Sequence, residues 1–174
     1  TSTAGTTISD YMDRTLDLGY AAGSAILVLL LITSLAVWYW REGSLSVSDI
    51  RSFRPELFYW TTILISNTLG TALGDYLADS SGLGFRDGAL LIGSLLLITA
   101  FAKFFTRAST VVLFWTAFVL TRPFGATFGD LLTKTHEQGG LDLGTIGSSA
   151  VLFGILAALM VYQTVEQKRV EARR

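Results

Sequence analysis

The stretch "TVVLFWTAFVLTRPFGATFGD" occupies residues 110–130. Its first twelve residues suit the hydrocarbon of a membrane, yet Arg122, Pro123 and Asp130 follow in the same run. An arginine at the centre of a spanning helix costs about 2.5–3.5 kcal/mol on insertion scales unless it finds a partner or water. The stretch therefore predicts a membrane helix whose second half faces a polar interior within the protein.

The composition of the whole chain predicts further membrane helices beside this one. Hydrophobic residues make up 51% of the 174 residues, charged residues only 16%, and the mean hydropathy is +0.51. Soluble globular domains are richer in charge, so these values indicate an integral membrane protein. A spanning helix needs about 20 mostly apolar residues. Charge-poor windows occur at 21–40, 57–74, 88–102, 108–121 and 143–165.

Three segments of the chain repeat one pattern. They read "GTTISDYMDRTLDLGYAAGSA" from residue 5, "GTALGDYLADSSGLGFRDGAL" from residue 70 and "GATFGDLLTKTHEQGGLDLGTIGSSA" from residue 125. An aspartate stands five residues after each first glycine, at Asp10, Asp75 and Asp130, and a Leu-Gly pair follows. Trp60 and Trp115 each precede their glycine by ten residues. Such spacing indicates a duplicated hairpin of two helices.

The repeats define the expected fold, an all-α polytopic transmembrane bundle of tandem two-helix units. We predict repeats at about 1–40, 56–105 and 110–165, followed by a cytoplasmic tail at 166–174, in one transmembrane domain spanning 1–174. The equivalent of the two tryptophans would fall before residue 1 in the first repeat, so we expect its first helix to be incomplete. About six crossings result.

The charged residues predict an orientation. Each repeat crosses the membrane twice, so all copies point the same way. Basic residues collect on the tryptophan side at Arg41, Arg51, Arg54, Lys103, Arg107, Lys168, Arg169, Arg173 and Arg174. The positive-inside bias makes this side and the C-terminus cytoplasmic. The opposite loops carry the acidic residues Asp13, Asp17, Asp79, Asp87, Glu137 and Asp142, which predicts an acidic outer mouth.

Helical spacing aligns the polar residues of each first helix into a stripe. The stripes are Ser2–Thr6–Asp10, Asn67–Thr71–Asp75 and Arg122–Ala126–Asp130, each with members four residues apart. Beside them lie the glycine pairs Gly70/Gly74 and Gly125/Gly129, which allow a second helix to approach closely. Pro123 cannot donate to the carbonyl of Val119 and is expected to open the helix there. We therefore expect the stripes to face protein.

The units "FYWTTILISNTLGTALGDYLADSSGLG" and "LFWTAFVLTRPFGATFGDLLTK", with "LDLGTIGSSA" following, resemble a bacterial family of uncharacterised membrane-anchored proteins built of two-helix repeats of unknown function. The resemblance covers almost the whole chain. It rests on Trp60 and Trp115, the tryptophans that mark the repeats, and on the glycine–aspartate spacing. It implies the bacterial inner membrane, and a typical member has four repeats and eight crossings.

The residues of the stripes suggest ion transport. Three carboxylates at one depth below an acidic mouth would attract cations and exchange protons. We expect a small transporter or channel for cations, for divalent metal ions or for proton-coupled solutes, with Asp10, Asp75 and Asp130 as the charge-carrying or metal-binding groups. Neutral oxygens would come from Thr6, Asn67, Thr71 and Thr127, and Arg122 would act as counter-charge or gate. Apart from such a bound cation, no cofactor is expected.

Two other classes of function stay open. The buried Asp and Arg groups would be purely structural in a regulatory or scaffold protein, and a membrane enzyme is the third reading. We predict no enzyme, because the single His136 has neither a cysteine nor a second histidine to build a zinc site and no nucleophile-elbow sequence occurs. The expected partners are the lipid bilayer, an inorganic cation and a second copy of the chain. No dense basic face indicates nucleic acid.

Overall fold

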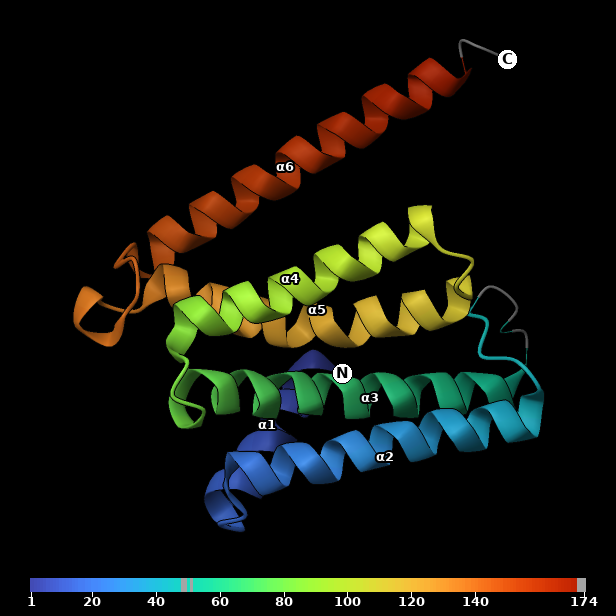
Figure 1. Ribbon diagram of the computed structural model, residues 1–174, viewed down its shortest axis with the longest axis horizontal. Helices are drawn as coiled ribbons and strands as arrows, with labels where there is room; N and C mark the ends of the chain where they lie inside the picture. The colour runs from blue at the N-terminus through green and yellow to red at the C-terminus, as the bar shows by residue number, and fades with distance from the viewer. Residues whose placement is uncertain (48–49, 51, 172–174) are drawn as a thin grey trace. The chain divides into compact units, whose positions relative to one another are not determined.

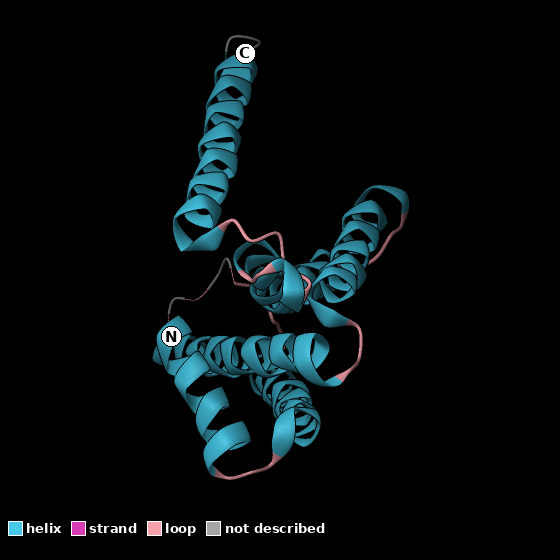
Figure 2. Cartoon of the chain, turned by 90° about the vertical axis from the view of Figure 1, so that its left-hand side faces the viewer, coloured by secondary structure: helices cyan, strands magenta, loops and turns pink. Residues whose placement is uncertain are grey.

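A computed structural model describes residues 1–47, 50 and 52–171 of the chain. These residues form helices joined by short connections and contain no strand (Figures 1 and 2), which confirms the all-α prediction. The long elements are α1 (Ser2–Asp10), α2 (Gly19–Glu42), α3 (Phe53–Asp75), α4 (Gly84–Phe105), α5 (Thr110–Thr133) and α6 (Gly144–Glu171). Two π-helical turns, η1 (Tyr11–Thr15) and η2 (Tyr76–Ser80), and one 3-10 turn, η3 (His136–Gln138), complete the list.

Four helices are long and apolar enough to cross a membrane: α2, α4, α5 and the part of α6 from Gly144 to Arg169. Helix α3 has 23 residues, a spanning length, but it is more polar than these four. Helix α1 has nine residues. Crossings by α1 and α3, which would make six, stay a prediction. Three of the basic residues used for orientation, Arg51, Arg173 and Arg174, lie outside the described residues.

The chain divides into two compact units, residues 1–128 and 129–174, with the boundary inside α5. In the first unit, α2 and α3 lie side by side (Figure 1) and share an apolar cluster of Leu27, Leu31, Leu69 and Ala72. A second cluster joins Trp38 and Ile63 to Trp115 of α5. The rings of Trp38 and Trp115 meet edge to face with centroids 5.6 Å apart. These clusters give the first unit its core.

Helix α3 also buries polar residues in the first unit. Thr62 and Ser66 are completely buried, and Thr68 is 2% exposed. The hydroxyls of Thr62 and Ser34 of α2 share a hydrogen bond of 2.8 Å. Hydroxyl pairs of this kind hold helices together in lipid, where apolar contact alone gives little driving force. The polar residues of α3 therefore face its neighbours. The low hydropathy of α3 does not by itself argue against a membrane crossing.

The Leu-Gly pair of each repeat marks a turn made by two left-handed residues. Gly19, Gly84 and Gly144 open the second helix of each repeat with φ of 71°, 72° and 61°. Two residues earlier stands Asp17, Gly82 or Asp142, again with positive φ. Glycine adopts this conformation without steric cost, and aspartate tolerates it better than most residues. The motif is therefore a conformational requirement of the hairpin turn.

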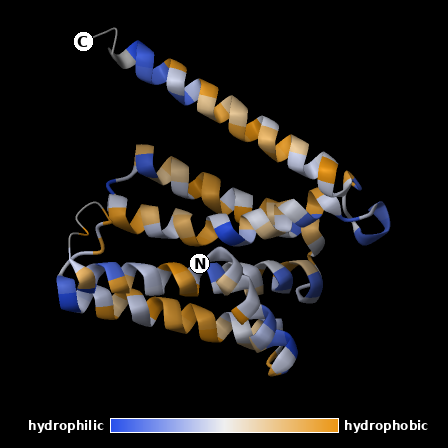
Figure 3. Ribbon diagram, turned by 180° about the vertical axis from the view of Figure 1, so that it is seen from behind, coloured by the Kyte–Doolittle hydropathy of each residue, from blue (hydrophilic) through white to orange (hydrophobic). Residues whose placement is uncertain are grey.

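In the second unit, the turn after α5 folds back onto the end of that helix. The amides of Leu141, Asp142 and Leu143 donate to the carbonyls of Leu131, Lys134 and Leu132 at 2.7–3.0 Å. A side chain on Gly140 would run into the Lys134 carbonyl, so only glycine fits there. Helix α6 follows. Figure 3 shows apolar residues along most of its length and polar residues toward its C-terminal end.

Candidate solute-binding cleft

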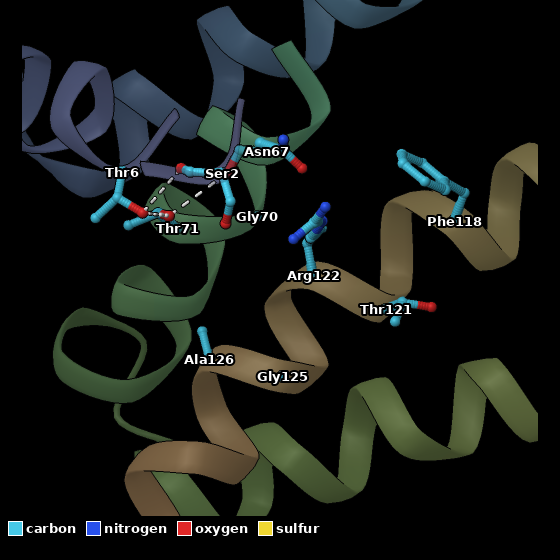
Figure 4. Close-up of a pocket in the computed structure, with 10 residues that line it drawn as sticks. All are labelled: Ser2, Thr6, Asn67, Gly70, Thr71, Phe118, Thr121, Arg122, Gly125 and Ala126. Atoms are coloured by element: carbon cyan, nitrogen blue, oxygen red, sulfur yellow. Dashed lines mark hydrogen bonds between the residues drawn. The ribbon is translucent and has the colours of Figure 1, made fainter. Parts of the chain in front are cut away.

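A cleft of about 410 Å³ lies in the first unit between the first helices of the three repeats (Figure 4). Equivalent positions of the three repeats line it. They are the position three residues before the first glycine of each repeat and the position directly after that glycine. Its ten lining residues are Ser2, Thr6, Asn67, Gly70, Thr71, Phe118, Thr121, Arg122, Gly125 and Ala126. The first two members of every predicted stripe are therefore brought together around one space.

Glycines set the spacing of the helices around the cleft. A Cβ on Gly5 of α1 would stand 2.7 Å from the Cβ of Asn67 on α3, and a Cβ on Gly70 would run into the Cβ of Arg122 on α5. One turn further, a Cβ on Gly74 would stand 2.7 Å from the Cβ of Ala126. Each of the first two repeats thus packs its glycine on the next repeat, as expected for small residues at membrane helix contacts.

Asn67 is a buried polar side chain with no hydrogen-bond partner. The residue is 4% exposed, and both Oδ1 and Nδ2 of its amide are unsatisfied. Leaving a buried donor or acceptor unpaired costs about 1–3 kcal/mol. Asn67 is one of the residues that line the cleft, so a turn of its side chain would present the amide to a molecule there (Figure 4).

Arg122 provides the only charge among the ten residues that line the cleft. Its Cβ and Cγ pack beside Gly70, and its guanidinium points toward Asn67 (Figure 4). Arg122 takes part in neither of the ion pairs Arg14–Asp10 and Arg169–Glu166. Within the described part of the chain, the cation sits in an apolar helix and no carboxylate lines the cleft beside it.

The hydroxyls on the α1 and α3 sides form a short chain at the edge of the cleft. Thr6 and Thr71 share a hydrogen bond of 3.3 Å between their Oγ1 atoms. Thr6 also lies 3.4 Å from the Ser2 carbonyl, to which it donates. Both threonines are equivalent residues of two repeats, so the predicted stripes meet here through their side chains.

Four of the predicted ion-binding residues do not line the cleft. Thr127 is completely buried and its hydroxyl donates to the Pro123 carbonyl at 2.9 Å. Helix α5 continues through Pro123, and the Thr127 hydroxyl bonds the Pro123 carbonyl rather than the Val119 carbonyl that the proline leaves without a donor. Asp10 is half exposed and pairs with Arg14 on its own helix at 3.6 Å. Asp75 belongs to the first unit and Asp130 to the second.

Asp10 and Asp75 do not support the hypothesis that the aspartates of the repeats bind a metal ion. Among the described residues, no group of three or more His, Cys, Asp and Glu side chains is arranged to hold a metal ion. Asp130 belongs to the unit 129–174, so a meeting of the three carboxylates stays a prediction.

The predicted packing glycines divide into two kinds. Gly70 and Gly74 contact α5 as described, whereas an added Cβ on Gly125 or Gly129 would meet no atom of the described chain within 4 Å. Gly125 instead forms part of the cleft wall. The same spacing thus serves helix contact in one repeat and an open surface in the next.

Asp13, one of the six acidic residues expected at the outer mouth, is buried, which the sequence analysis missed. It is 6% exposed, its Oδ1 has no partner, and Ser9 donates to its Oδ2 at 3.4 Å. A side chain on Gly23 would collide with its carboxylate. Burial, as the largest cause, raises the pKa of Asp13 above its ordinary value. The signal in the sequence was the glycine at residue 23, which lets α2 pass close to the turn.

Comparison with known families recovers the predicted repeats. The family described as Repeat of Unknown Function (DUF347) matches residues 1–44, 58–109 and 113–169. These three ranges agree with the predicted repeats to within a few residues. No curated protein and no solved structure matches the chain.

Proposed function

Because this chain belongs to the DUF347 repeat family, whose shared function is unknown, we propose a function from its own residues. The protein is a small integral membrane transporter or channel whose solute passes through the cleft between α1, α3 and α5. The observation that carries this proposal is the buried, unsatisfied amide of Asn67 beside the unpaired Arg122. Polar groups inside a membrane protein are costly and mark substrate or ion pathways.

The aspartates extend the same route in this proposal. Asp10 and Asp75 lie one helical turn beyond the cleft residues Thr6 and Thr71 on their stripes. They carry a cation or a proton that moves with the solute, and Asp130 takes the same part in the third repeat. The tryptophan side and the C-terminus face the cytoplasm of a bacterial inner membrane.

A non-transporting scaffold or regulatory protein is the second candidate. Two groups expected to bind ions have structural partners: Thr127 serves the Pro123 carbonyl, and Asp10 pairs with Arg14 at the surface. If all polar groups act this way, the cleft holds only water.

Flux measurements separate the two candidates. The protein is reconstituted into liposomes, and entry of H⁺ and of Mn²⁺ is followed with internal dyes. We expect wild-type flux above that of empty liposomes, and a loss of about tenfold or more for Asp75→Asn and for Asp130→Asn, because each removes an intramembrane charge. Glu42→Gln, at an exposed residue that ends α2 on the tryptophan side, is the matched control.

Each outcome decides between the candidates, provided that helix content and Tm are retained. Flux that is unaffected by either substitution removes the aspartates from the mechanism. Absence of wild-type flux for every solute tried favours the scaffold.

A further inference from the structure

We propose that the cleft binds an anionic oxygen group, a carboxylate or a phosphate, held by Arg122 and Asn67. The proposal names the substrate class for the transport function above and rests on it for its biological meaning. Binding itself can be measured without transport, so the two can fail separately.

The charge of the residues that line the cleft favours an anionic ligand. Arg122 is the one charged residue among the ten that line it, and no carboxylate lies among them. A bare cation entering this space would meet a positive charge in a medium of low dielectric constant, where like charges repel strongly. An anion would supply the partner that Arg122 lacks. The planar guanidinium binds carboxylate and phosphate through two parallel hydrogen bonds.

The unsatisfied amide of Asn67 also favours such a ligand, because it includes a hydrogen-bond donor without a partner. This donor, Nδ2, is buried, and Figure 4 shows the amide with its oxygen on the side of Arg122, so a rotation of the amide brings Nδ2 to the side of the guanidinium. A carboxylate oxygen can accept from Nδ2 while the group also pairs with Arg122. The hydroxyls of Thr6 and Thr71 line the α1 and α3 edge, where they hydrogen-bond to one another and to the Ser2 and Asn67 carbonyls. The donors for the anion therefore come from Asn67 of the second repeat and Arg122 of the third.

The helices fix the position of this donor set. Packing of the Arg122 Cβ and Cγ beside Gly70 fixes the base of this side chain at the cleft. Gly5 holds α1 against the backbone of α3 at Asn67 and Thr68 in the same way. A donor set that is already in position loses less conformational entropy on binding.

The shape of the cleft limits the anion. A volume of about 410 Å³ is at the small end of ligand sites, so the ligand is a small molecule or one headgroup. Phe118, Gly125 and Ala126 give the α5 wall an apolar part. The ligand therefore combines one anionic group with a short apolar body. A free organic acid and the phosphate of an anionic lipid both meet this description.

Binding of benzoate tests the proposal, with benzamide as the neutral molecule of the same shape. Purified full-length protein in a neutral maltoside detergent is titrated with each, and binding is followed by isothermal calorimetry or by saturation-transfer NMR. We expect benzoate to bind about tenfold or more tightly than benzamide, because a hydrogen bond to a charged group contributes about 1.5–3 kcal/mol. Equal binding of the two, or no binding of benzoate, overturns the proposal.

Two variants locate the site. Arg122→Gln removes the cation, and Asn67→Asp adds an internal carboxylate that pairs with Arg122 and fills the place of the anion. We expect both to lose benzoate binding by about tenfold or more. The second variant satisfies buried charge, so it keeps the test valid if Arg122→Gln does not fold. Arg107→Gln, at an exposed arginine in the connection before α5, is the control. Wild-type affinity in Asn67→Asp contradicts the assignment.

Nanodiscs distinguish the two sources of the anion. If phosphatidylglycerol nanodiscs weaken benzoate binding relative to phosphatidylcholine nanodiscs, the natural anion is a lipid headgroup. If both nanodiscs bind benzoate equally, it is a free solute. Benzoate binding without entry of labelled benzoate, or of H⁺ in its presence, into liposomes keeps this site and rejects the transport proposal.

Discussion

Helices α3 and α5 carry the same glycine spacing in different surroundings. Gly70 and Gly74 of α3 press against Arg122 and Ala126, whereas Gly125 of α5 is open and lines the cleft. Each glycine permits a close approach, but only a neighbouring helix determines whether the approach occurs. A duplicated motif can therefore build a contact in one repeat and a cleft wall in the next.

The marked tryptophans differ in the same way. Trp115 is 4% exposed, joins the cluster with Trp38 and donates to the Leu45 carbonyl at 3.1 Å. Trp60 is 48% exposed and reaches only Glu56 of its own helix, at 3.3 Å. Equivalent residues of two repeats therefore contribute unequally to stability.

The largest expected effect tests the glycine comparison directly. Gly70→Ala should cost about 3 kcal/mol, because its Cβ collides with the Cβ of Arg122 and the helices must separate. Gly125→Ala should change stability by less than about 1 kcal/mol and in the favourable direction, as alanine suits a helix better than glycine. Unfolding in mixed micelles, followed by circular dichroism, measures both. Equal effects would break the comparison.

The two tryptophans should show a smaller difference in their effects on stability. Trp115→Phe should cost about 1–2 kcal/mol, since it removes the hydrogen bond to Leu45 and part of a buried ring. Trp60→Phe should stay within about 0.5 kcal/mol, as surface substitutions do. The same unfolding measurement applies. A larger loss for Trp60→Phe would show that exposure of this residue does not reflect its environment in the membrane.

The smallest effect concerns Asp13, which Gly23 allows α2 to bury. Its folded-state pKa is raised, so the folded protein binds the proton more tightly than the unfolded chain, and stability falls as pH rises through that interval. Burial of this carboxyl therefore costs stability above that interval. Asp13→Asn should raise Tm at pH 7 and change it little below about pH 3, where the carboxyl is protonated in both states.

Asp17→Asn is the control for this pH dependence. The side chain of Asp17 is exposed in the same turn, and asparagine also tolerates its positive φ of 54°. A lower Tm of Asp13→Asn at pH 7 would mean that the hydrogen bond from Ser9 outweighs the cost of burial.

Much of the candidate site followed from periodicity. The i, i+4 spacing placed Asn67 and Thr71 on one face of α3, and the repeat placed Ser2, Thr6 and Arg122 on the matching faces of α1 and α5. The role expected for Thr127 as an ion ligand did not follow, because its hydroxyl has a nearer acceptor one turn back along α5. The burial of Asp13 was missed because it depends on a glycine of another helix.

The sequence by itself determined the helices, the three repeats and the polar stripes. Each of these properties follows from hydropathy, from a fixed spacing or from the backbone freedom of glycine, and all act over short stretches of chain. Only the tertiary structure decided that Gly70 makes a contact while Gly125 faces a cleft, and that Trp115 is buried while Trp60 is not. The physical reason is that burial depends on which distant helix lies alongside, and equivalent repeats have different neighbours.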